Sequence, residues 1–393
     1  MPGIDRRWLI LLCLFLGRTS LGVQFQSLVS VGEQVSGELG LSYAELGTLI
    51  GGMFLPGLVL AFPTGYLARI MSDRSAATLG LACVAGGGAV AVQLPGFEGI
   101  SAGRLLSGVG FVICSLYFTK MVADWFAGRE MAAAMGMLTM SWPAGIAISQ
   151  VTHGGIGEAF GWQTAIWTAT AYGAAMAALV WLSYRRPAHA AEASQANGEM
   201  RLTRREWKLT AAAALCWAGF NAGYAVYLAF APLVLIVRGV DPVTANETAS
   251  IASWLMMLSL PLGGILADWS KRPGWVLYIG MVTVIAAHFL LPLEGWTVAA
   301  AIAYGLIGMA PAGAIMALTG QAMAPERRAF GMAVFYSAMY PITALAPISG
   351  GWLYDLTGDV RSALAVGTAL FVMTIISYTA FRWMVKRQYI TEI

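Results

Sequence analysis

Apolar runs of membrane-spanning length recur along the whole chain. A helix needs about 20 apolar residues to cross the hydrocarbon core of a bilayer. Runs of that size lie at 8–31, 43–67, 75–95, 99–122, 131–153 and 162–184, and then at 208–236, 243–267, 274–293, 295–320, 329–353 and 361–385. The pattern predicts an all-α integral membrane protein with twelve transmembrane helices in two six-helix bundles. Gly and Pro within 43–67 and 295–320 predict that these two spans bend.

One long polar segment, Arg185 to Lys208, separates the two sets of runs. It is basic at both ends and rich in small polar residues, which is typical of a flexible linker. We therefore predict an N-terminal bundle over 1–184, a cytoplasmic linker over 185–207 and a C-terminal bundle over 208–393.

Composition agrees with a membrane protein and excludes several other classes. Hydrophobic residues make up 58% of the chain and charged residues only 11%, whereas soluble domains carry about 25% charged residues. The net charge of +3 is too small to indicate nucleic-acid binding. The four cysteines lie within apolar runs and lack the spacing of a metal site or a disulfide framework. We expect no cofactor and no metal. The spans contain neither a nucleophile–base pair nor a phosphate-binding loop, so the sequence does not predict an enzyme.

Basic residues fall mainly on one set of connections. The even-numbered loops, the linker and both ends of the chain hold nearly all of them, and the odd-numbered loops hold only Arg238 and Arg361. Positively charged loops stay in the cytoplasm. The pattern predicts a multi-pass protein of the inner (plasma) membrane with both termini and the linker in the cytoplasm. Arg6, Arg7 and the run that follows are interpreted as the first span and not as a cleaved signal.

The two halves repeat short sequence features. Gly65-Tyr-Leu-Ala-Arg69 after the second span matches Gly264-Ile-Leu-Ala-Asp268 after the eighth, and Gly154-Gly155 matches Gly350-Gly351. A repeat of half the chain length indicates duplication, with halves related by an axis along the membrane normal.

These features resemble the major facilitator superfamily over the whole chain. The resemblance rests on the loop after the eighth span, on an Arg followed by G-x-G in the fourth span, and on a Pro among glycines in the fifth. The matching residues are Gly264, Leu266, Ala267, Asp268, Lys271 and Arg272, then Arg104, Gly108 and Gly110, then Pro143 and Gly145. The resemblance implies a transporter of small molecules in the lipid bilayer, and we expect a monomer. Arg69 departs from the family, which has Asp there.

The first span points to a narrower resemblance. Gly17-Arg18-Thr19-Ser20 places an arginine in mid-helix, and Gln24 and Gln26 follow. This looks like the cyanate and nitroimidazole permease group, and more loosely like nitrate and organic-anion carriers.

Arg18 is the leading candidate for substrate binding. It lies about 15 Å along the helix from Trp8, where an arginine costs about 2.5–3.5 kcal/mol on insertion scales. Such a guanidinium can bind a carboxylate or a similar planar anion with two hydrogen bonds. The alternative is a structural Arg bonded to carbonyls of a neighbouring helix. None of the twenty acidic residues falls in a predicted mid-membrane position, so an anionic substrate is the simplest neutralising partner.

Further candidates come from polar side chains in other spans. Gln26 shares the Arg18 face. Arg104 either serves the cavity or braces the first span. Two further spans carry candidates that we expect either to contact substrate or to make interhelical packing contacts. They are Asn221 and Tyr224 in the seventh span, and Tyr336 and Tyr340 in the eleventh. Lys120 is expected beside Asp124 at the cytoplasmic surface, and His288 is expected to be a packing residue.

The sequence therefore predicts a secondary active or facilitative transporter of a small anion, inorganic or carboxylate, by alternating access. The alternative is efflux of neutral or aromatic compounds such as drugs or nitroimidazoles, because many Trp, Tyr and Met residues allow an adaptable apolar pocket. For gating we predict an asymmetric cytoplasmic latch. Asp268, with Lys271 and Arg272, would attract a helix N-terminus, whereas Arg69 in the first half cannot.

Overall fold

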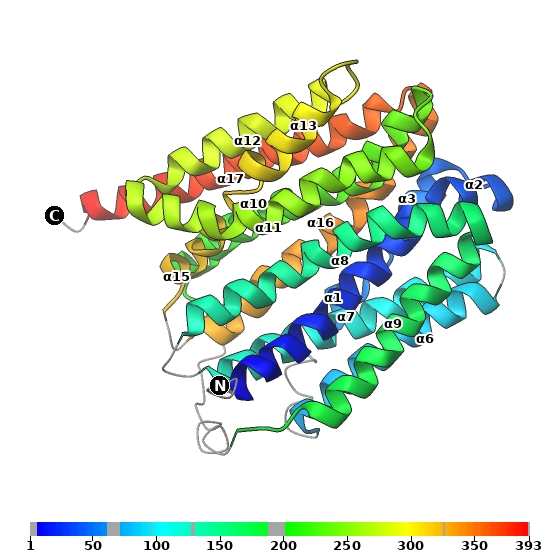
Figure 1. Ribbon diagram of the computed structural model, residues 1–393. Coiled ribbons are helices and arrows are strands. Elements are labelled where there is room, and N and C mark those ends of the chain that lie inside the picture. The colour runs from blue at the N-terminus through cyan, green and yellow to red at the C-terminus, as the bar shows by residue number, and fades with distance from the viewer. Residues whose placement is uncertain are drawn as a thin grey trace, which may run out of the picture. The chain divides into compact units, whose positions relative to one another are not determined.

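The computed structural model describes residues 6–60, 71–94, 96–126, 130–187, 201–324 and 327–391. Every regular element within these residues is a helix, and the chain divides into two compact units, Met1–Ala196 and Asn197–Ile393 (Figure 1).

The first unit packs its long helices in closely contacting pairs. Its helices are α1 (Arg6–Ser30), α2 (Gly32–Leu39), α3 (Tyr43–Gly51), α4 (Pro56–Leu60), α6 (Asp73–Gln93), α7 (Phe97–Trp125), α8 (Met131–Phe160) and α9 (Trp162–Ser183). Helix α6 lies against α7 and α9, while α1 lies against α8 and α9 (Figure 1).

The second unit is built around its first helix. Its helices are α10 (Arg204–Val237), α11 (Pro242–Ser270), α12 (Pro273–Leu290), α13 (Thr297–Ala303), the π-helix η3 (Tyr304–Gly308), α14 (Ala312–Met316), α15 (Leu318–Ala322), α16 (Arg328–Thr357) and α17 (Arg361–Thr391). Helix α10 contacts α16 and α17 most extensively, and α12 packs on α17.

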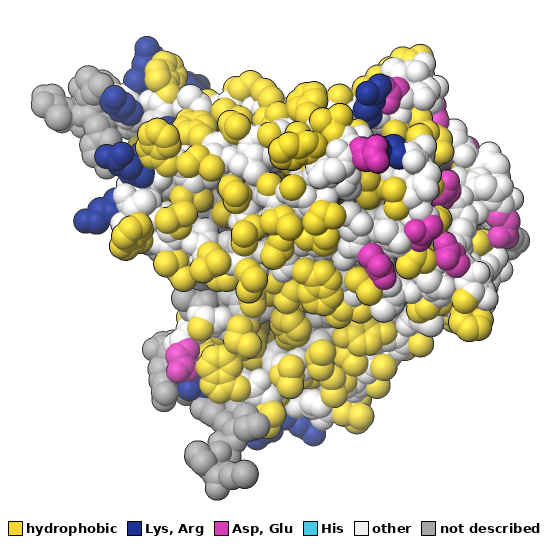
Figure 2. Space-filling view, turned by 45° about the horizontal axis from the view of Figure 1, so that its top comes forward, with side chains coloured by type: hydrophobic (Ala, Val, Ile, Leu, Met, Phe, Trp, Pro, Cys, Tyr) yellow, Lys and Arg dark blue, Asp and Glu magenta, His cyan; other side chains and the backbone are white. Residues whose placement is uncertain are grey.

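The predicted membrane spans are all represented in the described residues. Eleven helical spans there are long and apolar enough to cross a membrane, and the 30-residue helix α8 covers the predicted fifth span. Large apolar side chains remain on the outside, including Phe160 at 73% exposed and Trp269 at 82%. Figure 2 shows apolar side chains over most of the visible face. Such a surface suits lipid and not water, and the all-α membrane fold is confirmed.

Both predicted bends are also present. In the second span, helix α3 ends at Gly51 and α4 restarts at Pro56. The tenth span is broken into α13, η3, α14 and α15, with Pro311 immediately before α14. Pro lacks the N–H that a continuous helix needs, and π-helical turns accommodate one extra residue per turn.

Some helix boundaries differ from the prediction. Helix α10 begins at Arg204, four residues before the predicted start, because Thr203 and Glu206 form a reciprocal capping box that satisfies free backbone N–H groups. Helix α8 continues to Phe160 and stops at Gly161, whose φ of 86° ends the helix. The short helix α2 was not predicted.

Candidate functional site

Arg18 lies near the middle of α1 and contacts α8. It is partly buried, and its Nη1 donates a hydrogen bond of 2.7 Å to the Leu138 carbonyl and one of 3.5 Å to Ser141 Oγ. The carbonyl contact is the one that a purely structural Arg would make. Both of these acceptors are neutral oxygens of α8. A guanidinium has five N–H donors, and the Leu138 bond uses one of them.

The position of Arg18 depends on how closely α1 approaches α8. A Cβ at Gly22 would lie 2.6 Å from the Trp142 carbonyl oxygen, and one at Gly145 would lie 2.2 Å from that of Thr19. Real Cβ atoms essentially never come so close, so both positions require glycine. The two glycines bring the backbones together one turn from Arg18 in α1 and one turn from Ser141 in α8.

An aromatic cluster lies in the same part of the first unit. The Phe25 ring centroid is 5.3 Å from that of Phe54 and 5.5 Å from that of Trp142, and Phe111 is 5.6 Å from Phe54 and 5.2 Å from Trp142. Phe111 and Trp142 are only partly buried. The cluster was not predicted, because its four residues come from four different segments of the chain.

Gln26 is buried at the interface of α1 and α8. Its Nε2 lies 3.4 Å from Ser30 Oγ, and Ser30 donates to the Ser149 carbonyl of α8 at 3.4 Å. Within the described residues, Gln26 Oε1 has no hydrogen-bond partner. A buried carbonyl oxygen without a donor is costly, so this atom marks a polar position next to the same interface as Arg18.

Arg104 braces three segments of the first unit. Its guanidinium donates to the carbonyls of Leu49 (2.9 Å), Ile50 (3.2 Å), Gln24 (3.1 Å) and Phe25 (3.4 Å). The side chain is buried, and it lies 5.4 Å from the Phe25 ring centroid. These contacts favour the bracing alternative, because they join α7 to α1 and α3.

The candidates in the second unit are held by local contacts. Asn221 Nδ2 donates to the Trp217 carbonyl of its own helix at 2.8 Å, and Tyr224 Oη lies 3.2 Å from Ser253 Oγ. Asn221 and Tyr336 are partly buried, whereas Tyr224 and Tyr340 are each 5% exposed.

A second aromatic cluster fills the interior of this unit. Tyr227 and Tyr304 stack with centroids 4.0 Å apart, and His288 lies 5.7 Å from Tyr304 and 5.6 Å from Phe371. His288 Nδ1 is 3.1 Å from Thr368 Oγ1. The packing role expected for His288 agrees with these contacts, although its Nε2 has no partner in the described part of the chain.

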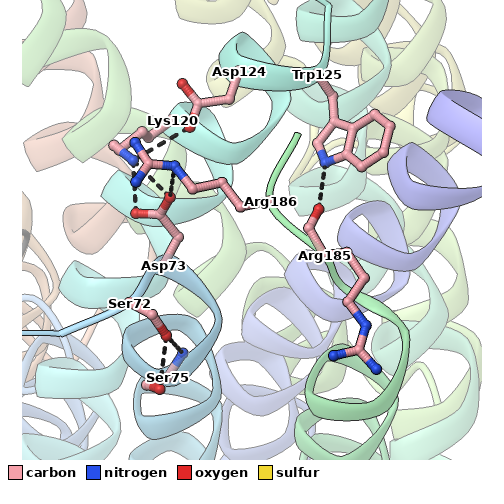
Figure 3. A network of polar contacts seen from close by, with 8 residues as sticks. All are labelled: Ser72, Asp73, Ser75, Lys120, Asp124, Trp125, Arg185 and Arg186. Carbon is pink, nitrogen blue, oxygen red and sulfur yellow. Dashed lines mark hydrogen bonds and ion pairs between the residues drawn. The ribbon is translucent and has the colours of Figure 1, made fainter. Parts of the chain in front are cut away.

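An ionic cluster closes one end of the first unit (Figure 3). Lys120 Nζ lies 2.7 Å from both oxygens of Asp73 and 3.3 Å from Asp124 Oδ2, and Arg186 Nε lies 3.7 Å from Asp73 Oδ2. Trp125 Nε1 also donates to the Arg185 carbonyl at 3.0 Å. The predicted neighbour of Lys120, Asp124, is confirmed. Asp73 lies closer to Lys120 than Asp124 does, and this contact was not predicted because Asp73 comes from a separate helix.

Comparison with known proteins identifies the family. The model of the Major Facilitator Superfamily matches residues 8–340. The chain belongs to the Major Facilitator Superfamily. It is therefore a multi-pass membrane transporter of small molecules and not an enzyme, as predicted.

Solved structures of superfamily transporters show the same fold. A bacterial homologue of the human lysosomal transporter Spinster, inward-facing and occupied, has a TM-score of 0.78 at 18% identity, with 98% of each chain covered. A point mutant of the nucleoside transporter NupG has a TM-score of 0.74 at 14% identity, covering 97% of this chain and 100% of that one. A D-xylose–proton symporter has a TM-score of 0.75 at 14% identity, with 97% of each covered. At these identities the similarity establishes the fold alone. The search of curated proteins gave no match.

The superfamily signature in α7 has a packing role here. A Cβ at Gly108 would lie 2.3 Å from the Met53 carbonyl oxygen, and one at Gly110 would lie 2.2 Å from that of Gly80. These glycines let α7 pack directly on the bent second span and on α6, and so hold Arg104 against the carbonyls that it binds.

The superfamily loop motifs are only partly described. Arg69 and the Asp268 side chain lie outside the described residues, so the predicted latch stays a prediction. Lys271 and Arg272 are exposed between α11 and α12, and Lys271 has a φ of 53°, in the left-handed region. Glu206 at the start of α10 accepts bonds from the Ala324 N–H at 3.0 Å and from Arg327 at 3.3 Å. This contact ties α10 to the connection before α16.

Proposed function

We propose that this superfamily member transports a small anion by alternating access, with Arg18 as the principal binding group. One observation carries the proposal: a guanidinium near the middle of a 25-residue spanning helix is partly exposed and is positioned by neutral oxygens of α8. Charges at this depth are costly and normally serve a pathway or a partner. An anionic substrate supplies the opposite charge that such a group favours.

The surroundings of Arg18 favour a carboxylate with an apolar body. Phe111 and Trp142 are partly exposed members of the first aromatic cluster, and Trp142 directly follows Ser141, which Arg18 contacts. Arg binds carboxylate in a bidentate manner, while aromatic faces favour apolar or planar groups. An inorganic anion would bind the guanidinium of Arg18 but would make no use of the aromatic faces.

Other side chains are proposed in supporting roles. Gln26 Oε1 can accept a hydrogen bond from a substrate or from a water that accompanies it. Asn221, Tyr224, Tyr336 and Tyr340 are proposed as contacts contributed by the second half. Arg104 is assigned a positioning role, because its four carbonyl partners, two in α1 and two in α3, join the helix that carries Arg18 to its neighbours.

The proposed orientation places both termini and the linker on the cytoplasmic side of a bacterial-type plasma membrane. Its support is the excess of Lys and Arg on the even-numbered loops. The Gly17-Arg18-Thr19-Ser20 segment supports a place near the cyanate and nitroimidazole permeases within the superfamily.

The test is an uptake panel in proteoliposomes. Aromatic and aliphatic monocarboxylates, inorganic anions such as nitrate, and neutral aromatic compounds are compared at several pH values and imposed potentials. We expect saturable transport of a monocarboxylate, at a rate that depends on the imposed membrane potential or pH gradient. Transport of neutral aromatics alone would replace the proposal with the efflux alternative.

A further inference from the structure

An open groove lies between α12 and α17 of the second half. Its volume is about 730 Å³. It is lined by Lys271, Arg272, Pro273, Gly274, Trp275, Tyr278, Ile279, Val282, Thr283, Tyr378 and Arg382. From these residues we infer that the groove binds an anionic phospholipid, with the phosphate at its basic end and an acyl chain along its apolar end.

The basic end of the groove carries three exposed cations, and no carboxylate lines it within the described part of the chain. Lys271 and Arg272 come from the connection between α11 and α12, and Arg382 comes from the last part of α17. Within the described residues, none of the three lies within ion-pair distance of an acidic side chain. Three cations that converge on one groove attract a phosphate group.

The backbone at this end is held in an unusual conformation. Lys271 has a φ of 53°, in a region that non-glycine residues rarely adopt. The following residue, Arg272, lies directly before α12, and Pro273 is the first residue of that helix. The strained turn thus places two adjacent cations at the mouth of the groove.

The rest of the groove is apolar and follows one face of α12. Trp275 is 62% exposed, Ile279 52% and Val282 60%. These positions are four and three residues apart, so they share one helix face and extend about 10 Å from the basic end. Such a stripe offers an acyl chain a continuous contact in the direction of the bilayer centre.

Aromatic residues mark the level at which a lipid headgroup would lie. Trp275 and Trp383 are both exposed near this end of the second half, and Tyr278 packs edge-on against Tyr378 with its hydroxyl 2.9 Å from Thr379 Oγ1. Trp and Tyr concentrate at the membrane–water interface. The three cations next to them therefore lie at phosphate level, on the cytoplasmic side in the proposed orientation.

A free phosphate or a soluble phosphate ester would satisfy only the basic end. A zwitterionic lipid would satisfy the apolar end but would bring a positive group to three cations. The combination of both ends selects an anionic phospholipid such as phosphatidylglycerol.

Native mass spectrometry of the full-length protein tests the inference. Protein in detergent is titrated with phosphatidylglycerol, phosphatidylcholine or inorganic phosphate, and the retained lipid is counted. We expect wild-type protein to retain phosphatidylglycerol at least about tenfold more tightly than phosphatidylcholine. The triple variant Lys271→Gln, Arg272→Gln, Arg382→Gln should lose this preference.

A matched triple variant controls for net charge. Arg204, Arg205 and Lys208 are exposed basic residues of α10 that do not line the groove, and replacing them with Gln removes the same charge. This variant should keep the preference. An equal loss in both variants, or equal retention of the two lipids by wild type, would overturn the inference. Binding of inorganic phosphate with no lipid preference would do so too.

A second measurement does not depend on the triple variant folding well. Wild-type protein and Trp275→Phe are placed in vesicles whose phosphatidylglycerol or phosphatidylcholine carries brominated acyl chains. The fluorescence difference between the two proteins reports on Trp275, and brominated phosphatidylglycerol should quench it more strongly at equal mole fraction. Equal quenching by the two lipids would refute the inference.

Discussion

Gly145 of α8 lies so close to Gly22 of α1 that a Cβ at position 145 would be 3.0 Å from the Gly22 Cα and 2.2 Å from the Thr19 carbonyl oxygen. This contact sets the depth at which Arg18 meets Leu138 and Ser141. Two glycines therefore control the geometry of the proposed binding group without touching a substrate.

Replacing Gly145 with Ala should destabilise the first half. The added methyl group must push α1 from α8, and overpacking of this kind costs about 1–3 kcal/mol. The matched control is Gly136→Ala on the same helix, where an added Cβ has nothing within 4 Å. Thermal unfolding in detergent should show a lower midpoint for Gly145→Ala and an unchanged or higher one for Gly136→Ala. Equal midpoints would contradict the close packing.

Replacing Arg18 with Gln should strongly reduce saturable uptake of the carboxylate substrate. Charge-assisted hydrogen bonds contribute about 1.5–3 kcal/mol, which corresponds to roughly a 10- to 150-fold loss in kcat/KM. Arg18→Lys keeps the charge but not the planar fork, so we expect partial activity. Proteoliposome uptake measures both variants. Undiminished uptake by Arg18→Gln would remove the anion proposal and leave the transporter assignment intact.

Replacing Arg104 with Leu should lower stability while leaving substrate affinity in the folded fraction unchanged. The variant removes the hydrogen bonds that Arg104 donates to buried carbonyls of α1 and α3, and lost hydrogen bonds to a charged group cost about 1.5–3 kcal/mol each. Unfolding midpoint and KM are measured on the same preparation. A raised KM with an unchanged midpoint would instead assign Arg104 to the substrate.

Asp73 and Lys120 should show a strong energetic coupling. Their two contacts of 2.7 Å join α6 to α7, and Asp73 is buried. A double-mutant cycle with Asp73→Asn and Lys120→Gln should give a coupling energy of about 1–3 kcal/mol in thermal or denaturant unfolding. The parallel cycle with Asp124→Asn should give less, because that contact is longer and lies within one helix. Equal couplings would show that Asp73 has no special part in the cluster.

Asp268→Asn tests the predicted latch. Charge–dipole attraction contributes about 0.3–1 kcal/mol, and up to ~2 kcal/mol when partly buried, so the variant should shift the balance between the two conformations and alter the transport rate. Accessibility of single cysteines introduced at opposite ends of the spans measures that balance. Unchanged rate and unchanged accessibility would exclude the latch.

The sequence predicted the fold well because membrane spans are long, apolar and separated by charged loops. It also predicted that the spans 43–67 and 295–320 bend, and that Lys120 lies beside Asp124, four residues away. It could not find contacts made between distant segments. The aromatic cluster of Phe25, Phe54, Phe111 and Trp142 joins four segments, and Asp73 reaches Lys120 from another helix.

Arg104 illustrates the limit for individual site residues. Its position within α7 allowed either a substrate role or a brace, and only the bent second span brings Leu49 and Ile50 to its guanidinium. For Arg18, the position in the span predicted a positive charge deep in the membrane. It did not predict that the guanidinium would donate a hydrogen bond to the Leu138 carbonyl.

The anchoring of Arg186 to Asp73 and the capping of α10 by Thr203 have a consequence for the movement of the chain during transport. Arg186 contacts Asp73 of the first half and Thr203 caps α10 of the second, and about sixteen residues separate these two positions in the sequence. Fully extended, that stretch covers about 60 Å. This length is an upper bound on the distance between Arg186 and Thr203 in any step of the transport cycle. A linker shortened below the distance that the cycle requires would slow transport.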